Sequence, residues 1–227
     1  MRFMRRMQDS TIDAVFVTRV RELEERLFPD ACDPADSVHL KNDGYSWLYR
    51  PSHHASTGLV IDSDVKFLSR PGARLLSVGG HPAYLERTLV ELGVPAGNIV
   101  AADVLPAITD SNLAFETACF DMLGPWPEMG TFDRIIFPES LCIALTDRLK
   151  KTGPHGDAPF AMDPQEAKLL CGVLCSALQR LRPGGEIRAN GPQSHPNVVK
   201  AARSLVEARG FPHELDYQRY FLKVKNA

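Results

Sequence analysis

The residues best suited to bind a ligand are a glycine-rich turn and an acidic residue further along the chain. Gly79 and Gly80 follow the apolar run 74–78 and lead into a helical pattern. The backbone there can approach a ligand closely and present amide groups at a helix N-terminus. Asp103 lies 24 residues after Gly79, at the end of the next apolar run, where its carboxylate can contact a ligand at the same edge of the sheet. We therefore expect a ligand cradle formed by residues 78–82 and Asp103.

A second group of candidates follows the apolar run 132–137. Glu139 and Ser140 lie just past this run, where the crevice at the carboxyl ends of parallel strands would hold a substrate. A carboxylate in that place can act as a general base or orient an amine. A solvated loop is the alternative. Glu139 is therefore a candidate catalytic residue.

Aromatic and histidine residues give a less specific signal. Tyr45, Trp47 and Tyr49 either pack the N-terminal region onto the domain or roof the site, where aromatic rings attract a cation. The sequence leaves both open, and Tyr45 is kept as a second candidate catalytic residue. Four histidines are expected to lie on the surface or in hydrogen-bonded loops: His53, His54, His155 and His195. Their spacing does not suit a metal site, so we predict no metal.

The elements that must position these residues divide the chain at about residue 72. Residues 1–72 carry two predicted helices, at 10–28 with Ser10 as N-cap and at 52–69, and form an appendage or lid. From residue 73 to 227, strands and helices alternate, which predicts a compact α/β unit with a doubly wound, mostly parallel sheet of seven strands. The predicted strands are 74–78, 98–102, 118–122, 132–137, 186–189 and one or two within 213–224. Helices are predicted to begin near Leu85, at Asp163 and at Pro196.

The composition indicates an ordinary globular protein. The chain has 227 residues, 44% hydrophobic and 24% charged, with a formal net charge of -2. This balance gives no bulk attraction to a nucleic-acid backbone, so we expect no nucleic-acid partner. Its five cysteines include no C-x-x-C pair, which suits free thiols in a reducing compartment. With no apolar run suited to a signal peptide or a membrane span, we predict a cytoplasmic protein.

Four features together resemble the class I S-adenosylmethionine-dependent methyltransferases. Residues 75–84 look like the family's first motif, a strand and a glycine-rich turn, and Asp103 matches its acidic residue after the second strand. Residues 132–137 are similar to the Phe-Asp start of its fourth strand. Residues 181–187 match its Leu-Lys/Arg-Pro-Gly-Gly turn before the fifth. Their order and spacing carry the resemblance, which covers about residues 73–225.

The resemblance implies S-adenosyl-L-methionine as cofactor and methyl transfer to a small molecule. Asp121 falls where the family's third strand presents an acidic group to the adenine amino nitrogen. The implied cofactor-binding residues are Val78, Gly79, Gly80, His81, Pro82, Asp103, Val104, Asp121, Met122 and Pro138. No membrane partner is implied, and a homodimer is left open.

Two departures from the family pattern keep alternatives open. Ser77 stands where the family commonly has an acidic residue, and His81 stands where it commonly has glycine. One alternative is transfer of the cofactor's aminocarboxypropyl group, as in enzymes similar to nicotianamine synthase. Another is a methyltransferase-like fold that has lost catalysis and serves as a binding module. A nicotinamide-dependent reductase is a more distant third.

Overall fold

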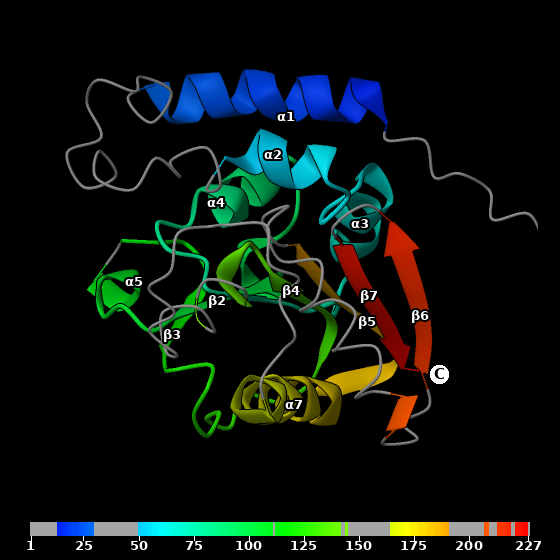
Figure 1. Ribbon diagram of the computed structural model, residues 1–227. Coiled ribbons are helices and arrows are strands. Elements are labelled where there is room, and N and C mark those ends of the chain that lie inside the picture. Colours follow the sequence, from blue (N-terminus) through cyan, green and yellow to red (C-terminus); the bar gives the residue numbers. More distant parts are fainter. Residues whose placement is uncertain are drawn as a thin grey trace, which may run out of the picture.

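The computed structural model describes residues 13–29, 50–110, 112–141, 144, 164–190, 207–208, 213–218 and 221–226. Its strands form one seven-stranded sheet in the order β3-β2-β1-β4-β5-β7-β6 (Figure 1). Their bounds are β1 (Leu75–Val78), β2 (Ile99–Asp103), β3 (Glu116–Cys119), β4 (Phe132–Phe137), β5 (Leu181–Asn190), β6 (His213–Gln218) and β7 (Phe221–Asn226). Strands β1 to β5 pair in parallel, and β7 is antiparallel to β5 and β6. The mostly parallel α/β sheet expected from the sequence is therefore confirmed.

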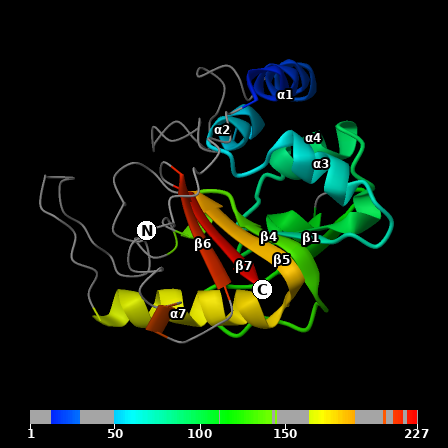
Figure 2. The same ribbon diagram turned by 90° about the vertical axis from the view of Figure 1, so that its right-hand side faces the viewer.

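Helices cover both faces of the sheet (Figures 1 and 2). One face carries α1 (Ala14–Leu27), α2 (Pro51–Ser56), α3 (Asp62–Leu68) and α4 (Tyr84–Glu91), and the other carries α7 (Pro164–Gln179). A short helix α5 (Ala107–Asp110) follows β2, and a 3-10 turn, η3 (Ala96–Asn98), precedes it. Since both faces are covered, the central strands can be apolar along their whole length.

Alternating side chains of the central strands enter two separate cores. Leu76 and Val78 of β1 pack with the apolar stripe of α7. Leu75, on the opposite face, packs with residues of α1 to α4, including Phe16 and Leu68. The helices before β1 thus share a hydrophobic core with the sheet.

The N-terminal helices differ from the expected ones at two points. Helix α1 begins after Asp13, whose Oδ1 accepts hydrogen bonds from the amides of Val15 and Phe16 at 3.0 and 3.2 Å. The prediction of Ser10 as N-cap was wrong, because Asp13 satisfies these first free amides instead. The single helix expected over 52–69 is two helices, α2 and α3. Gly58 between them has φ +76°, a left-handed conformation that ends a helix.

Two strand boundaries also differ. Strand β3 spans residues 116–119 rather than 118–122, because Asp121 accepts the amide of Leu123 in a local turn. Residues 183–185, expected as a turn before the fifth strand, lie within β5 as an irregularity. Phe132 pairs with Leu181 there, whereas Arg134 pairs with Glu186. The predicted cap Asp163 lies outside the described residues, and of the helix predicted over 196–209 only residues 207–208 are described, as helix.

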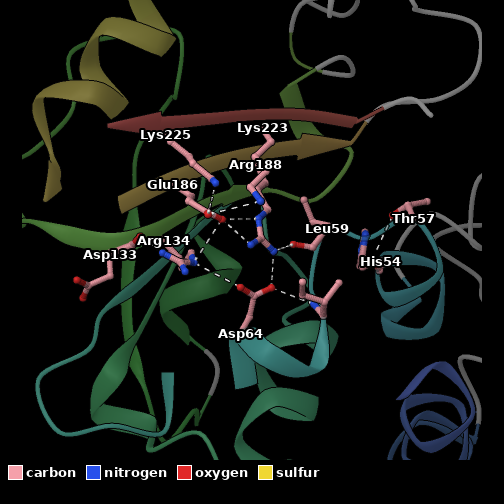
Figure 3. A network of polar contacts seen from close by, with 11 residues as sticks. His54, Thr57, Leu59, Asp64, Asp133, Arg134, Glu186, Arg188, Lys223 and Lys225 are labelled. Carbon is pink, nitrogen blue, oxygen red and sulfur yellow. Dashed lines mark hydrogen bonds and ion pairs between the residues drawn. The ribbon is translucent and has the colours of Figure 1, made fainter. Parts of the chain in front are cut away.

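A buried charge network attaches α3 to the sheet (Figure 3). Arg188 of β5 is 3% exposed and bonds the carboxylates of Asp64 and Glu186. Arg134 lies 3.4 Å from Asp64 and 3.8 Å from Glu186, and Lys223 and Lys225 lie 3.5 and 4.0 Å from Glu186. Burial opposes ionisation of Glu186, but the charge and hydrogen bonds of Arg188, with Arg134 and Lys223, outweigh it and lower its pKa.

Removing the central cation should destabilise the fold. We expect Arg188→Ala to lower the free energy of unfolding by about 3–5 kcal/mol, because two buried carboxylates lose their main partner. Urea denaturation followed by circular dichroism measures this. The control is Lys66→Ala, which removes an exposed partner of Asp62 on the same helix and should leave stability unchanged. Equal stability of the Arg188 variant and the parent would contradict a structural role for the network.

Candidate functional site

The site lies where the strand order reverses, between β1 and β4. In open α/β sheets, ligands bind outside the carboxyl ends of the strands at such a reversal. Two segments leave the sheet there: residues 79–82 after β1 and residues 138–140 after β4. The predicted ligand-binding residues Gly79 and Gly80 and the predicted catalytic residue Glu139 lie in these two segments. The strand order brings the two segments together.

The turn after β1 is held by backbone bonds and by a close contact with Ser140. The amides of Gly79 and Gly80 donate to the carbonyl of Ala102 at 2.7 and 3.2 Å. Gly79 has φ +80°, and a Cβ built on it would lie 2.0 Å from Cβ of Ser140. Ser140 Oγ in turn donates to the carbonyl of Val78 at 2.5 Å. Glycine is therefore required at position 79 by both conformation and space.

Asp103 faces this turn from the end of β2. Its Oδ2 accepts the amide of His81 at 3.1 Å, and its Oδ1 accepts the amide of Leu105 at 2.9 Å. The side chain is nearly buried, at 8% exposed. A carboxylate has about four acceptor positions, so two remain for hydroxyl groups of a ligand.

Glu139 is held in an unusual conformation directly after β4. Its φ is +56°, which is sterically unfavourable for a residue with a side chain. Its amide donates to Oδ1 of Asn190 at 2.8 Å, and this bond from the end of β5 holds the conformation in place. Strain of this kind persists only where the surroundings enforce it, and it occurs preferentially at functional sites.

The carboxylate of Glu139 pairs with a histidine from α2. Oε1 lies 2.8 Å from Nε2 of His53, and the side chains are 2% and 19% exposed, respectively. Oε2 is buried and has no hydrogen-bond partner among the residues that the structure describes. A buried acceptor without a partner is costly, so this oxygen is suited to a donor on a ligand.

Asn190 also fixes the neighbouring histidine. Because its Oδ1 accepts from Glu139, its Nδ2 faces Nδ1 of His54 at 3.2 Å and Oγ1 of Thr57 at 3.3 Å. An amide nitrogen only donates, so Nδ1 of His54 is the acceptor. Burial, with a smaller contribution from the charge of His53, lowers the pKa of His54 to about 3. His54 is therefore a neutral structural residue that holds α2 against β5.

A third carboxylate, that of Glu86 near the start of α4, packs against the glycine turn. The residue is 0% exposed, and a Cβ built on Gly80 would lie 2.7 Å from its Oε1. Neither oxygen has a hydrogen-bond partner in the described part of the chain. Burial raises the pKa of Glu86 to about 7; the nearby Ser77 hydroxyl and the residue's own amide act against this, and the charge of Asp103 adds to it.

A small pocket opens beside the glycine turn. It is lined by residues 79–82 of the turn, the start of α4 with Glu86, His54 and Pro138. Within the described ranges, no three side chains of the metal-binding types come together. Among the described residues that line the pocket, Glu86 supplies the one carboxylate, and the amides of the turn donate to Ala102, Asp103 and Gly80.

The remaining predicted residues occupy different positions. Met122 lies beside the turn, with its Cε 3.5 Å from the Cβ position of Gly79. Val104 is 59% exposed beside Asp103, and neighbouring Leu105 is 49% exposed. Asp121 lies two residues beyond β3 and closes its own turn. Tyr45 lies outside the described residues.

Sequence reasoning missed His53, Asn190 and Glu86. His53 was interpreted as a surface or loop residue, but the structure pairs it with the carboxylate of Glu139. Glu86 occupies a position in an amphipathic helix that sequence patterns treat as solvent-facing. The one signal for Glu86 was Ser77, because a small residue replaces the expected acidic one where space for another carboxylate is needed.

Comparisons with known proteins identify the fold. No protein-family model and no curated protein matches the sequence. A methyltransferase from Pyrococcus furiosus is similar in structure, with a TM-score of 0.51 and 14% identity, covering 94% of this chain and 97% of that one. The chain has a methyltransferase fold. The Rossmann-like architecture that the motifs suggested is thereby confirmed.

Two further solved structures are similar at lower scores. The N-methyltransferase NodS from Bradyrhizobium japonicum, in complex with S-adenosyl-L-homocysteine, has a TM-score of 0.45 and 12% identity, covering 91% of this chain and 98% of that one. CalS10, an amino pentose methyltransferase from Micromonospora echinaspora with its cofactor bound, has a TM-score of 0.45 and 12% identity, covering 73% and 88%. Among the helices of this methyltransferase fold that the structure describes, none has the length and apolar character to cross a membrane.

The buried Glu86 should make stability depend on pH. Its pKa is near 4.5 when unfolded and about 7 when folded, so the folded state binds more protons and its stability falls between pH 4.5 and pH 7. We expect Glu86→Gln to remove this fall, which amounts to about 3 kcal/mol. Urea denaturation at a series of pH values measures the difference. Glu91→Gln, on the exposed side of the same helix, is the control, and an unchanged pH profile in the Glu86 variant would contradict burial of its carboxyl group.

Proposed function

We propose that the chain is an S-adenosylmethionine-dependent methyltransferase that acts on a small-molecule acceptor. The observation that carries the proposal is the tie between Asp103 and the glycine turn at the reversal of strand order, with Glu139 beside it. The sequence motifs indicate which cofactor binds, and the methyltransferase fold is consistent with that cofactor. The proposed location of the protein is the cytoplasm. A second copy of the chain is left open as a partner.

The residues present fit the cofactor. Asp103 keeps acceptor positions for ribose hydroxyls beside the turn of residues 79–82. The exposed Val104 and Leu105 offer an apolar surface for an adenine ring beside that carboxylate. When bound, S-adenosylmethionine supplies an electrophilic methyl group on a sulfonium.

Glu139 and His53 serve the acceptor in this proposal. The buried Oε2 of Glu139 accepts a hydrogen bond from the acceptor's N–H or O–H and takes up its proton. Nε2 of His53 donates to Oε1 and orients the carboxylate. Asn190 holds the Glu139 backbone, so the carboxylate keeps one position relative to the turn.

Ligand binding tests the cofactor assignment. We expect S-adenosylhomocysteine to bind in isothermal titration calorimetry, and Asp103→Asn to weaken this binding roughly 10- to 100-fold, because a charged acceptor of the ribose is lost. Glu116→Gln, an exposed change on β3, is the control and should bind like the parent. Absence of binding at millimolar ligand would refute the assignment.

An acceptor screen tests the chemistry. Against small amines and alcohols, methyl transfer releases S-adenosylhomocysteine, whereas aminocarboxypropyl transfer releases 5′-methylthioadenosine, so the product distinguishes the two. With an acceptor that the parent methylates, we expect Glu139→Gln to lower kcat about a hundredfold or more. Its affinity for S-adenosylhomocysteine should stay within about twofold, since the residue serves the acceptor. An unchanged kcat would remove Glu139 from the mechanism.

A further inference from the structure

Glu86 is a buried carboxylate that neither the fold nor the proposed acceptor chemistry uses. It lines the pocket beneath the turn, yet both of its oxygens have no hydrogen-bond partner within the described residues. Among those residues it also has no ion pair, whereas the buried Asp64 and Glu186 are each paired with arginine. An isolated buried carboxylate is costly in free energy, so its retention calls for a reason.

The glycine at position 80 makes room for the buried carboxylate of Glu86 beside the pocket. A Cβ on Gly80 would lie 2.7 Å from Oε1, so any side chain there would collide with the carboxylate. Ser77 of β1 lies on the same side, with its Oγ 3.4 Å from that position. The turn is thus shaped so that the carboxylate lies close beneath a backbone that is free of side chains.

No lysine or arginine is among the described residues that line the pocket. The titratable groups that face Glu86 are Asp103 from β2, His54 from α2, and His81 and Tyr84 at the turn and the start of α4. His54 is neutral because it is buried. Since Asp103 adds a negative charge nearby, a positively charged ligand group is the complement that this pocket lacks.

We infer that Glu86 binds the ammonium group of the methionine portion of S-adenosylmethionine and releases a proton to solvent as it does so. This inference rests on the proposed function. The carboxylic acid of Glu86 loses its O–H proton, and the resulting carboxylate pairs with the ligand's –NH3+, which keeps its own protons. Helix α4 therefore supplies the negative charge that Ser77 does not provide from β1.

Two ligands that differ in this group provide the test. S-adenosylhomocysteine carries the ammonium, and 5′-methylthioadenosine lacks the whole aminocarboxypropyl arm but keeps the adenosine. We expect Glu86→Gln to weaken binding of S-adenosylhomocysteine about tenfold or more at pH 8, and to leave the affinity for 5′-methylthioadenosine within about twofold. Glu91→Gln on the same helix should change neither affinity. Circular dichroism shows whether each variant is folded.

Proton release is a second readout that needs no variant. Titration of the parent protein with S-adenosylhomocysteine at pH 6.5, in two buffers of different ionisation enthalpy, gives the number of protons released. We expect net release with this ligand and none with 5′-methylthioadenosine.

The outcomes separate this inference from the proposed function. If Glu86→Gln binds S-adenosylhomocysteine like the parent, or if the parent releases no proton, the role of Glu86 is refuted while the cofactor assignment stands. If the parent binds neither ligand at millimolar concentration, the proposed function fails and the inference fails with it. If the variant binds neither ligand, proton release by the parent protein decides the role of Glu86. Release with S-adenosylhomocysteine supports that role, and no release refutes it.

Discussion

The site depends on the close packing of the chain segments that leave β1 and β4. These strands are neighbours at the reversal of strand order, so Gly79 lies against Ser140 with no space for a Cβ. The bond from Ser140 to the carbonyl of Val78 joins the two segments, and the amides of the turn join them to β2. Because this contact fixes the turn, Asp103 and Glu139 keep defined positions relative to one another. Interiors packed at this density transmit small displacements, so the geometry of the site follows from the sheet.

Three buried or nearly buried carboxylates near the turn have different environments and therefore different chemistry. Asp103 accepts hydrogen bonds from two backbone amides, which fix the position of its carboxylate. Glu139 has one oxygen paired with His53 and one without a partner in the described part of the chain. Glu86 has no ion pair with a described residue, and burial raises its pKa to about 7. One side-chain type thus occupies three different environments around the same turn.

The N-terminal helices contribute to the site as well as to the fold. Glu24 of α1 accepts the amide of Ser52 at 2.8 Å and so caps the start of α2. Helix α2 places His53 beside Glu139 and His54 beside Asn190. The charge network around Arg188 anchors α3, which follows α2 in the chain (Figure 3). Stability and site geometry are therefore coupled, because the elements that complete the site are held by the same buried contacts as the core.

The sequence by itself determined the α/β class, the glycine turn, Asp103 and the strand 132–137, since apolar runs and glycines act locally. Strand β3 was misplaced by about two residues because it is an exposed edge strand with a weak apolar pattern. Only the tertiary structure decided that His53 pairs with Glu139, 86 residues later, and that Glu86 is buried under the turn. Such pairs are set by packing between elements distant in sequence, and local periodicity carries no information about which elements meet.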